Sequence, residues 1–393
     1  MRACFFRGTE DPIRARRGAR KLGLTLLAAA VMTAACGGRE EPTKGLEVSV
    51  TWKRKFRGEI AAFSMGASGL QIVVATMPDA KGRGEDRIYA LDEKGEITWQ
   101  EILDHRVLGT AVSADGRFMA AYLLDGTLRA WNAEGDSLWK TSCVGPPEAA
   151  AAGNLVACRA TVEEGTPQGS ALQVFDLSGK RRWSWDDSSG LWDLRVGDRG
   201  DSLVGVTQAG KVVRLDGRGR VVWTKDLETG VGTVAISPGD GAVVVVGTGI
   251  EKERISAYDR AGSALWTATV PGGVDSLAVS RGGSYVAATN NTILGQRVFV
   301  FDARGKLFWK YQLDRPARDP VKVRMGEMGD RVFAGLEQDG RPTLVGWDRH
   351  GEVTTRILLG VELVDFDLSR DGRRLAAVGR GGKLFFFNLG EPP

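Results

Sequence analysis

The residues that could do chemistry are few and scattered along the 393-residue chain. Only two histidines are present, His105 and His350, and we expect both at the surface. No cluster with metal-ligand spacing accompanies them, so the sequence predicts no metal site and no cofactor. Ser68 lacks a full nucleophile-elbow pattern, and the glycine-rich stretch 379–383 lacks the Ser or Thr of a phosphate loop. These patterns favour a protein that is not an enzyme.

Cys36 is the residue for which the sequence most clearly indicates a chemical modification, and a leader precedes it. Residues 1–35 contain a basic region and then an apolar run from Leu22 to Met32 that is too short to span a bilayer. The segment Thr33–Gly38 resembles a bacterial lipoprotein cleavage box, which implies lipidation of Cys36. Residues 36–46 then form a short tether. The alternative is an ordinary signal peptide that is cleaved nearby.

Removal of this leader during export would change the net charge of the chain. It holds seven of the 53 basic and two of the 49 acidic residues, which leaves 46 basic against 47 acidic residues. No basic stripe remains, so we expect no nucleic-acid partner. An oxidising compartment would allow a disulfide between Cys143 and Cys158, but the sequence leaves that bond open.

The elements that position these residues are revealed by a repeated phrase: an apolar run, Asp-x-x-Gly, three free positions and Trp. The phrase indicates two strands joined by a tight turn, because Asp can accept bonds from the backbone ahead and Gly tolerates positive φ. Its first polar residue recurs every ~40–46 residues, at Asp92, Asn132, Asp176, Asp216, Asp259, Asp302, Asp348 and Asn388. Such a period, made only of strands, predicts a β-propeller of four-stranded blades.

Strand counting predicts eight blades over residues 47–390. Each blade has strands a to d from the centre outward. The C-terminus supplies no d strand, whereas an unmatched strand from Val48 to Phe56 precedes the first repeat. We therefore expect an all-β, eight-bladed propeller in which the N-terminal strand completes the C-terminal blade beside Lys383 to Asn388.

The repeated tryptophans are expected to form a structural girdle between neighbouring blades, with a cost of ~3–5 kcal/mol for replacing one by Ala. The girdle consists of Trp52, Trp99, Trp139, Trp183, Trp223, Trp266 and Trp309. Together with the strand pattern it resembles the quinoprotein-like propeller repeats and, less closely, WD-repeat propellers. The repeat departs from the quinoprotein-like pattern by having Asp-x-x-Gly in place of Asp-x-x-Thr-Gly.

Charges on the innermost strands form a second pattern. Lys322 and Arg324 of blade seven lie at positions equivalent to Asp365 and Asp367 of blade eight, and blade four has Asp193 and Arg195 there. Because blades seven and eight are neighbours, we expect ion pairs near the central channel. They either fix blade order or contribute to a ligand site, and the first interpretation is favoured.

The b–c and d–a loops share one face of a propeller, here called the loop face, and the a–b and c–d turns share the opposite turn face. Length variation falls on the loop face. The irregular loops are Met77 to Arg87, Thr161 to Ser170, Thr289 to Gln296, Asp186 to Gly190 and Asp314 to Pro320. The loop face is therefore the expected working face.

Partner-binding candidates on the loop face fall into two groups. Trp185, Asp186, Asp187 and Trp192 surround one d–a loop, and Arg315 and Arg318 lie in another, three blades away. Aromatic side chains beside charges suit a protein interface. Packing of the two tryptophans under the loop is the alternative.

An exported, lipid-anchored eight-bladed propeller is similar in architecture to the propeller lipoproteins of the outer-membrane β-barrel assembly machine. That resemblance implies a monomeric, non-catalytic lipoprotein of the cell envelope, at the outer membrane and facing the periplasm, which binds envelope proteins. The alternative is a quinone-dependent dehydrogenase. Its calcium-binding group and catalytic Asp cannot be placed on residues of this sequence.

Overall fold

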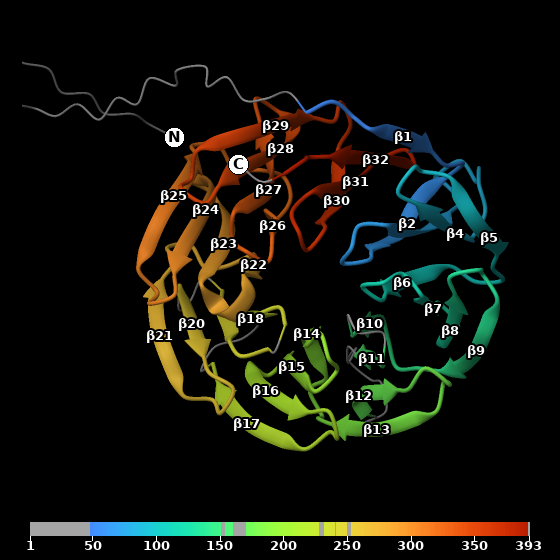
Figure 1. Cartoon of the computed structure of the whole chain (residues 1–393), viewed down its shortest axis with the longest axis horizontal. Coiled ribbons are helices and arrows are strands. Elements are labelled where there is room, and N and C mark those ends of the chain that lie inside the picture. Colours follow the sequence, from blue (N-terminus) through green and yellow to red (C-terminus); the bar gives the residue numbers. More distant parts are fainter. Residues whose placement is uncertain are drawn as a thin grey trace, which may run out of the picture. The chain divides into compact units, whose positions relative to one another are not determined.

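The structure is a computed structural model that describes residues 48–150, 154–159, 170–227, 232–239, 241–249 and 253–391. The leader, Cys36 and nearly all of the tether lie outside these residues, as does the loop from Thr161 to Ser170 apart from the backbone of its last residue. The described residues form eight four-stranded antiparallel sheets arranged as a ring (Figure 1). The predicted eight-bladed β-propeller is confirmed. In the described part of the chain, no helix is long and apolar enough to cross a membrane.

The first four blades follow one another around the ring, each with its strands in sequence order. Blade one contains β2 (Glu59–Met65), β3 (Gln71–Met77), β4 (Arg87–Asp92) and β5 (Ile97–Ile102). Blade two contains β6 (Val107–Val112), β7 (Phe118–Leu123), β8 (Thr127–Asn132) and β9 (Ser137–Ser142). Blade three contains β10 (Pro147–Ala149), β11 (Val156–Arg159), β12 (Ser170–Phe175) and β13 (Arg181–Asp186). Blade four contains β14 (Leu191–Val196), β15 (Ser202–Thr207), β16 (Lys211–Asp216) and β17 (Val221–Asp226).

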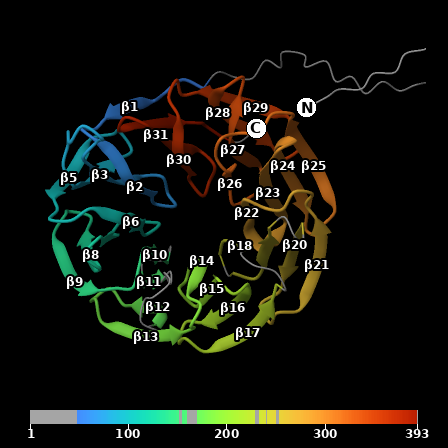
Figure 2. The same cartoon turned by 180° about the vertical axis from the view of Figure 1, so that it is seen from behind.

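The remaining blades continue in the same sense, and Figure 2 shows them from behind. Blade five contains β18 (Gly232–Ile236), β19 (Val244–Thr248), β20 (Arg254–Tyr258) and β21 (Ala264–Thr269). Blade six contains β22 (Ser276–Val279), a 3-10 turn (Arg281–Gly283), β23 (Tyr285–Thr292), β24 (Gly295–Asp302) and β25 (Leu307–Leu313). Blade seven contains β26 (Val323–Met325), β27 (Arg331–Gln338), β28 (Arg341–Asp348) and β29 (Val353–Leu358).

Blade eight closes the ring with strands from both ends of the chain. It contains β30 (Leu363–Leu368), β31 (Arg374–Gly379), β32 (Lys383–Asn388) and β1 (Trp52–Lys55). The register pairs Trp52 with Phe386 and Lys55 with Lys383, in the order expected from the unmatched N-terminal strand. The Trp52 ring stacks on Phe386 with centroids 5.1 Å apart. The edge of β32 is thereby covered.

The repeated phrase forms the c–d turn of each blade. In the first copy, Asp92 Oδ1 accepts the backbone N–H groups of Lys94 (2.9 Å) and Glu96 (2.8 Å), while Gly95 adopts a φ of 78°. A Cβ on Gly95 would lie 2.6 Å from Trp52 Cδ2. A side chain is therefore excluded at this glycine for two reasons, its positive φ and the neighbouring ring.

The same contact recurs around the ring, because each girdle tryptophan lies over the turn glycine of the next blade. The pairs are Trp52–Gly95, Trp99–Gly135, Trp139–Gly179, Trp183–Gly219, Trp223–Gly262, Trp266–Gly305 and Trp309–Gly351. Four of these indoles also donate Nε1–H to a backbone carbonyl in that turn or next to it, as Trp139 does to Leu177 (2.7 Å). The tryptophans thus connect blades at the turn face.

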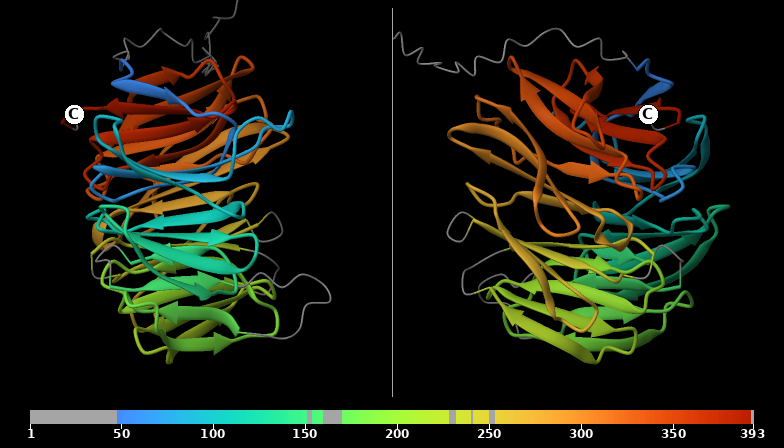
Figure 3. Two further views of the ribbon diagram at one scale, coloured as in Figure 1. Left: turned by 90° about the vertical axis from the view of Figure 1, so that its right-hand side faces the viewer. Right: turned by 60° about the vertical axis from the view of Figure 1, so that its left-hand side comes forward.

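The hydrophobic core is divided in the same way. The buried residues form eight clusters, and each cluster combines side chains of two successive blades. Between blades one and two, for example, Val73 and Ile88 pack with Met119 and Trp131. Figure 3 shows the ring from the side, with turns and loops gathered at opposite faces.

Candidate functional site

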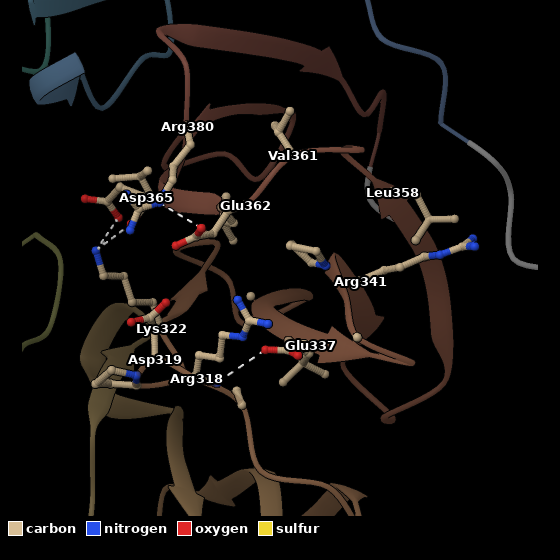
Figure 4. Close-up of a pocket in the computed structure, with 18 of the residues that line it drawn as sticks. Arg318, Asp319, Lys322, Glu337, Arg341, Leu358, Val361, Glu362, Asp365 and Arg380 are labelled. Carbon is tan, nitrogen blue, oxygen red and sulfur yellow. Dashed lines mark hydrogen bonds and ion pairs between the residues drawn. The ribbon is translucent and has the colours of Figure 1, made fainter. Parts of the chain in front are cut away.

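A cleft on the loop face lies between blades seven and eight and has a volume of about 880 Å³. Its walls come from the loop before β26, the ends of β27 and β28, and the loop between β29 and β30. Figure 4 shows its charged lining residues: Arg318, Asp319, Lys322, Glu337, Arg341, Glu362, Asp365 and Arg380. Apolar lining residues include Leu358 and Val364, with 63% and 46% of their surface exposed.

The four innermost charges of blades seven and eight meet at the inner end of this cleft. Lys322 Nζ lies 3.0 Å from Asp365 Oδ1, and Arg324 Nε lies 3.1 Å from Asp367 Oδ1. Arg324 Nη2 is also 3.9 Å from Asp365 Oδ1. The structure therefore brings together the groups that the sequence aligned. Removal from bulk water raises the pKa of Asp367, against the lowering effect of Arg324.

A second charged cluster lies on the far wall of the channel. Arg195 Nη1 is 2.8 Å from Asp193 Oδ1 and 3.6 Å from Glu148 Oε2. Asp193 Oδ2 also accepts the Thr233 hydroxyl at 3.0 Å. Asp193 and Arg195 were predicted, whereas Glu148 was missed because its strand has only three residues and follows Pro146. The enclosure of Glu148 raises the pKa of its carboxyl.

The loop that contains Arg315 and Arg318 is held by side chains of blade six. Gln296 Nε2 donates to the carbonyls of Arg315 (3.0 Å) and Glu337 (2.8 Å), and Gln296 is fully buried. Asn291 donates to the carbonyl of Ala317 (2.8 Å) and accepts its N–H (2.9 Å). A d–a loop is thus fixed by side-chain amides of the adjacent hairpin, of which Gln296 is fully buried and Asn291 partly buried.

These amides correct one expectation from the sequence. The stretch from Thr289 to Gln296 was predicted to be a loop, but it lies mostly in β23 and β24, and only Ile293 and Leu294 separate the two strands. The run of polar residues misled the prediction. Thr289, Asn290 and Gln296 are buried because their side chains bond backbone groups of neighbouring segments: Thr289, for example, donates to the carbonyl of Val321.

The two candidate tryptophans of the loop face, Trp185 and Trp192, have different environments. Trp185 is partly buried and packs on the core between blades three and four, as the alternative interpretation held. Trp192 exposes 51% of its surface on the loop face. Asp186 is exposed, and Asp187 Oδ1 accepts the N–H of Ser189 at 3.0 Å, so Asp187 shapes the loop. Only Trp192 of this pair offers a large aromatic surface to a partner.

The arginine group differs in pairing. Arg315 Nη1 is 3.9 Å from Asp339 Oδ1, and both side chains are largely exposed. Arg318 lines the cleft, and its backbone N–H donates to Glu337 Oε2 at 3.3 Å. The structure places this group and Trp192 on one face but in different blades, without bringing them into one site.

The turn face is closed by contacts that the sequence did not reveal. Arg370 Nη2 of blade eight lies 2.6 Å from Asp198 Oδ1 of blade four, and these blades are opposite each other in a ring of eight. The turn at Arg370 also donates its N–H to the Ala67 carbonyl and accepts the Glu327 N–H, both at 2.7 Å. The central a–b turns are therefore bonded to one another.

The cysteines and histidines of the propeller were the remaining candidates for chemistry. Cys143 and Cys158 form a disulfide that joins the end of blade two to β11 of blade three, which settles the bond left open by the sequence. His105 and His350 are both exposed, and His105 Nε2 lies 3.6 Å from Asp125 Oδ2. Within the described ranges, no three His, Cys, Asp or Glu side chains are grouped so that they could hold a metal ion.

Comparison with solved structures finds other propellers. Sqt1 from Chaetomium thermophilum superposes with a TM-score of 0.68 and 18% identity, covering 88% of this chain and 100% of that chain. Chaetomium thermophilum Sqt1 bound to the N-terminus of the ribosomal protein L10 gives a TM-score of 0.66 and 19% identity, covering 85% and 98%. BamB from Moraxella catarrhalis gives a TM-score of 0.61 and 14% identity, covering 87% and 99%. At these identities the likeness shows the fold.

Comparison of sequences places the chain in a family. A search of curated proteins finds no match. A family model described as outer membrane protein assembly factor BamB matches residues 48–189, 84–247, 168–334 and 251–388, which together span the whole propeller. The chain therefore belongs to the family of the outer membrane protein assembly factor BamB.

Proposed function

We propose that this protein is a non-catalytic docking platform of the cell envelope, which uses its loop face to bind proteins during outer-membrane protein assembly. The observation that carries the proposal is a difference between the two faces of the ring. On the turn face, backbone groups of central turns bond to one another. On the loop face, a cleft of about 880 Å³ and exposed apolar side chains are left for a partner.

The chemistry of the loop face suits protein binding. Trp192, Leu358 and Val364 expose 51%, 63% and 46% of their surfaces, and each lies within one or two residues of a charged side chain. Buried aromatic and aliphatic anchors surrounded by polar groups supply most of the binding energy in protein interfaces. The rigid ring beneath them lowers the entropy lost on binding.

Two comparisons support the same role. The family is described as an outer membrane protein assembly factor. The Sqt1 propeller is described as bound to the N-terminus of a ribosomal protein, so this architecture can hold a protein segment. We extend both properties to this chain as part of the proposal.

The proposal includes an outer-membrane location through lipid on Cys36. It rests on the leader, the cleavage box and the short tether in the sequence. Replacing Cys36 by Ser should move the protein from the membrane fraction to the soluble periplasmic fraction. Fractionation with immunoblotting measures this, and unchanged retention in membranes would refute the lipid anchor.

Affinity purification from detergent-solubilised membranes tests the docking role. The wild-type chain should recover subunits of the β-barrel assembly machine. Trp192→Ala and Arg318→Ala, which alter the loop face, should each reduce that recovery several-fold. Lys94→Ala and Arg304→Ala alter exposed c–d turns of the turn face and serve as matched controls. Equal loss from both pairs, or loss from the controls alone, would mean that the loop face is not the docking face.

A further inference from the structure

The c–d turns of the turn face contain positions that take no part in the repeated contacts. In blade one, Asp92 binds backbone N–H groups, and Gly95 lies against the Trp52 ring. Lys94 and Glu96, by contrast, are exposed to solvent. Residues at such exposed positions can differ between blades without loss of the ring, so their composition is free to serve another purpose.

Charge at the c–d turns divides the ring into two halves. The turns of blades three to six, counted from the first Asp to the residue before the Trp, are residues 176–182, 216–222, 259–265 and 302–308. They hold eight basic and four acidic residues. The turns of the other blades, which hold two basic and eight acidic residues, are 92–98, 132–138, 348–354 and 388–391. The near-neutral total charge outside the leader conceals this division, which corrects the expectation that no basic stripe remains there.

Most of the basic side chains in blades three to six have no acidic partner. Arg220 Nη2 lies 2.7 Å from Asp216 Oδ2, and Arg260 Nη2 lies 3.4 Å from Asp201 Oδ2. The others are exposed and make no ion pair with any residue that the structure describes: Lys180, Arg181, Arg182, Arg218, Arg304 and Lys306. Positive charge is therefore left at the surface in three of the four blades.

The central a–b turns of these blades do not cancel the surplus. Arg199 and Arg281 lie in these turns, and Asp198 and Asp201 match them in number. Asp240 lies outside the described residues and would lower the surplus by one charge. Blades three to six thus keep an excess of positive charge at the turn face.

Exposed apolar side chains gather at the same turns. Seven large apolar residues of the c–d turns are exposed, and Leu138 of blade two is the only one of them outside blades three to six. The other six each expose 41–49% of their surface: Leu177, Val221, Val222, Leu265, Leu307 and Phe308. Basic and apolar side chains are therefore interleaved along one part of the ring.

These turns form a continuous surface, which we call the basic arc and which consists of residues 176–182, 216–222, 259–265 and 302–308. Neighbouring turns are in contact because each girdle tryptophan lies over the glycine of the next turn, from Trp183 to Gly305. Figure 1 shows the strands that leave these turns, β13, β17, β21 and β25, following one another along the outer rim.

The chain also enters the ring at the turn face. Trp52 pairs with Phe386 at the end of β32 that leads into the last c–d turn. Thr51 donates its N–H to the Phe386 carbonyl (2.9 Å), and its hydroxyl accepts the N–H of Asn388 (2.8 Å). A lipid on Cys36 would therefore be attached from this side, through residues 37–47, which can span about 40 Å when extended.

We propose that the basic arc lies on the anionic lipid surface of the membrane to which the chain is anchored. Its Lys and Arg side chains bind headgroup phosphates, and its apolar side chains enter the interface between headgroups and acyl chains. The acidic turns of the other blades are repelled, so the ring is tilted and the tether spans the gap at blade eight. The loop face is then directed away from the bilayer.

The shape of the arc favours lipid over an acidic protein. Its charges follow a convex rim across four blades and stand on long side chains, and mobile headgroups can match such a distribution. The inference goes beyond the proposed docking role and assigns a second surface. It uses the lipid anchor of that proposal only to bring a membrane within reach.

Lysine acetylation of the full-length chain, purified from membranes and reconstituted with vesicles, measures the contact. Mass spectrometry compares vesicles of phosphatidylglycerol with vesicles of phosphatidylcholine. Phosphatidylglycerol should slow acetylation of Lys180 and Lys306 at least about threefold, because a lipid phosphate covers each amine. Three other exposed lysines should react equally in both: Lys81 and Lys211 of the loop face and Lys94 of the acidic half.

A charge exchange tests the arc while keeping both of its lysines as reporters. R218E/R304E places Glu at the position that Glu134 occupies in blade two, so the turn accepts this residue. The variant should abolish the difference between the two kinds of vesicle. The matched control R57E/R106E makes the same charge change at exposed arginines of the loop face and should behave as the wild type does. Circular dichroism melts check that all chains are folded.

Equal acetylation of the two arc lysines in both kinds of vesicle would overturn the inference. So would equal slowing at all five lysines, no effect of R218E/R304E, or an equal effect of R57E/R106E. Slower acetylation of the arc lysines in native membranes, without slowing in phosphatidylglycerol, would assign the arc to an acidic protein instead. The docking role is tested in detergent, where no bilayer is present, so either proposal can fail alone.

Discussion

The two faces of the ring differ in the contacts between their segments, although side-chain contacts such as Arg370–Asp198 occur on the turn face as well. On the turn face, neighbouring turns bond backbone to backbone, as Ser68 does to Ala114 (3.2 Å) and Arg370 to Ala67 (2.7 Å). On the loop face, segments are held by side chains such as Gln296 and Asn291. Backbone contacts need a fixed geometry in every blade, which favours a repeated sequence. Contacts through side chains allow each loop to differ.

This difference separates the part that maintains the ring from the part that is free to acquire function. The turn face repeats one motif, whereas the loop face differs between blades: among the described residues it has the cleft beside blades seven and eight, the long hairpins of blades six and seven, and the exposed Trp192 of blade four. Substitutions of the repeated turn-face residues should therefore act on stability, and substitutions on the loop face should act on binding.

Removing the closing strand should give the largest effect. Deletion of residues 48–56 removes Trp52 and Phe56 from the core and leaves the β32 edge unpaired. The loss should exceed about 5 kcal/mol, because each large aromatic side chain contributes ~3–5 kcal/mol. Thermal unfolding followed by circular dichroism measures it. A melting temperature within a few degrees of the wild type would contradict the role given to this strand.

The next largest effect concerns the girdle. Trp139→Ala should lower the free energy of unfolding by ~3–5 kcal/mol, because the indole packs on Gly179 and donates to the Leu177 carbonyl. Urea denaturation gives this value. A loss below about 1 kcal/mol would show that the blades are held together elsewhere.

The bridge across the channel should contribute less. Arg370→Ala and Asp198→Asn should each cost about 1–3 kcal/mol, because each leaves a partly enclosed charge without its partner. A double-mutant cycle in urea isolates the coupling between them. Additive single effects would indicate that the bridge does not connect blades four and eight energetically.

The smallest effect on stability is expected on the loop face. Trp192→Ala should change the free energy of unfolding by no more than about 0.5 kcal/mol, because half of the side chain is already in solvent. Under the proposed docking role it should nevertheless reduce recovery of subunits of the β-barrel assembly machine. A stability loss similar to that of Trp139→Ala would erase the distinction between the two faces.

The girdle and the c–d turns of the turn face were predictable from the sequence because their contacts recur. Asp-x-x-Gly and the following Trp are local signals, and their repetition gave blade number, blade order and closure. The alignment of inner strands also placed Lys322 beside Asp365. These predictions needed only a period and a hairpin register.

The remaining contacts depend on single pairs of residues that are far apart in the sequence and are not part of the repeated motif. Asp198 and Arg370 belong to turns of opposite blades, so nothing in their own segments indicates the bridge. Gln296 lies in a run of polar residues and therefore resembled a loop residue. Its amide is nevertheless buried and donates to the backbone carbonyls of Arg315 and Glu337. The cleft likewise depends on how two blades meet, which no single repeat contains.

The composite eighth blade has a consequence for the order of events during synthesis. Trp52 leaves the ribosome among the first residues of the ring, whereas its partner Phe386 leaves among the last. At ~5–20 residues per second the interval is on the order of tens of seconds, during which β1 has no strand to pair with. An unpaired strand of this kind can join the β32 edge of another copy and exchange ends between molecules. A newly made chain is therefore most open to such exchange until its last strand has been made.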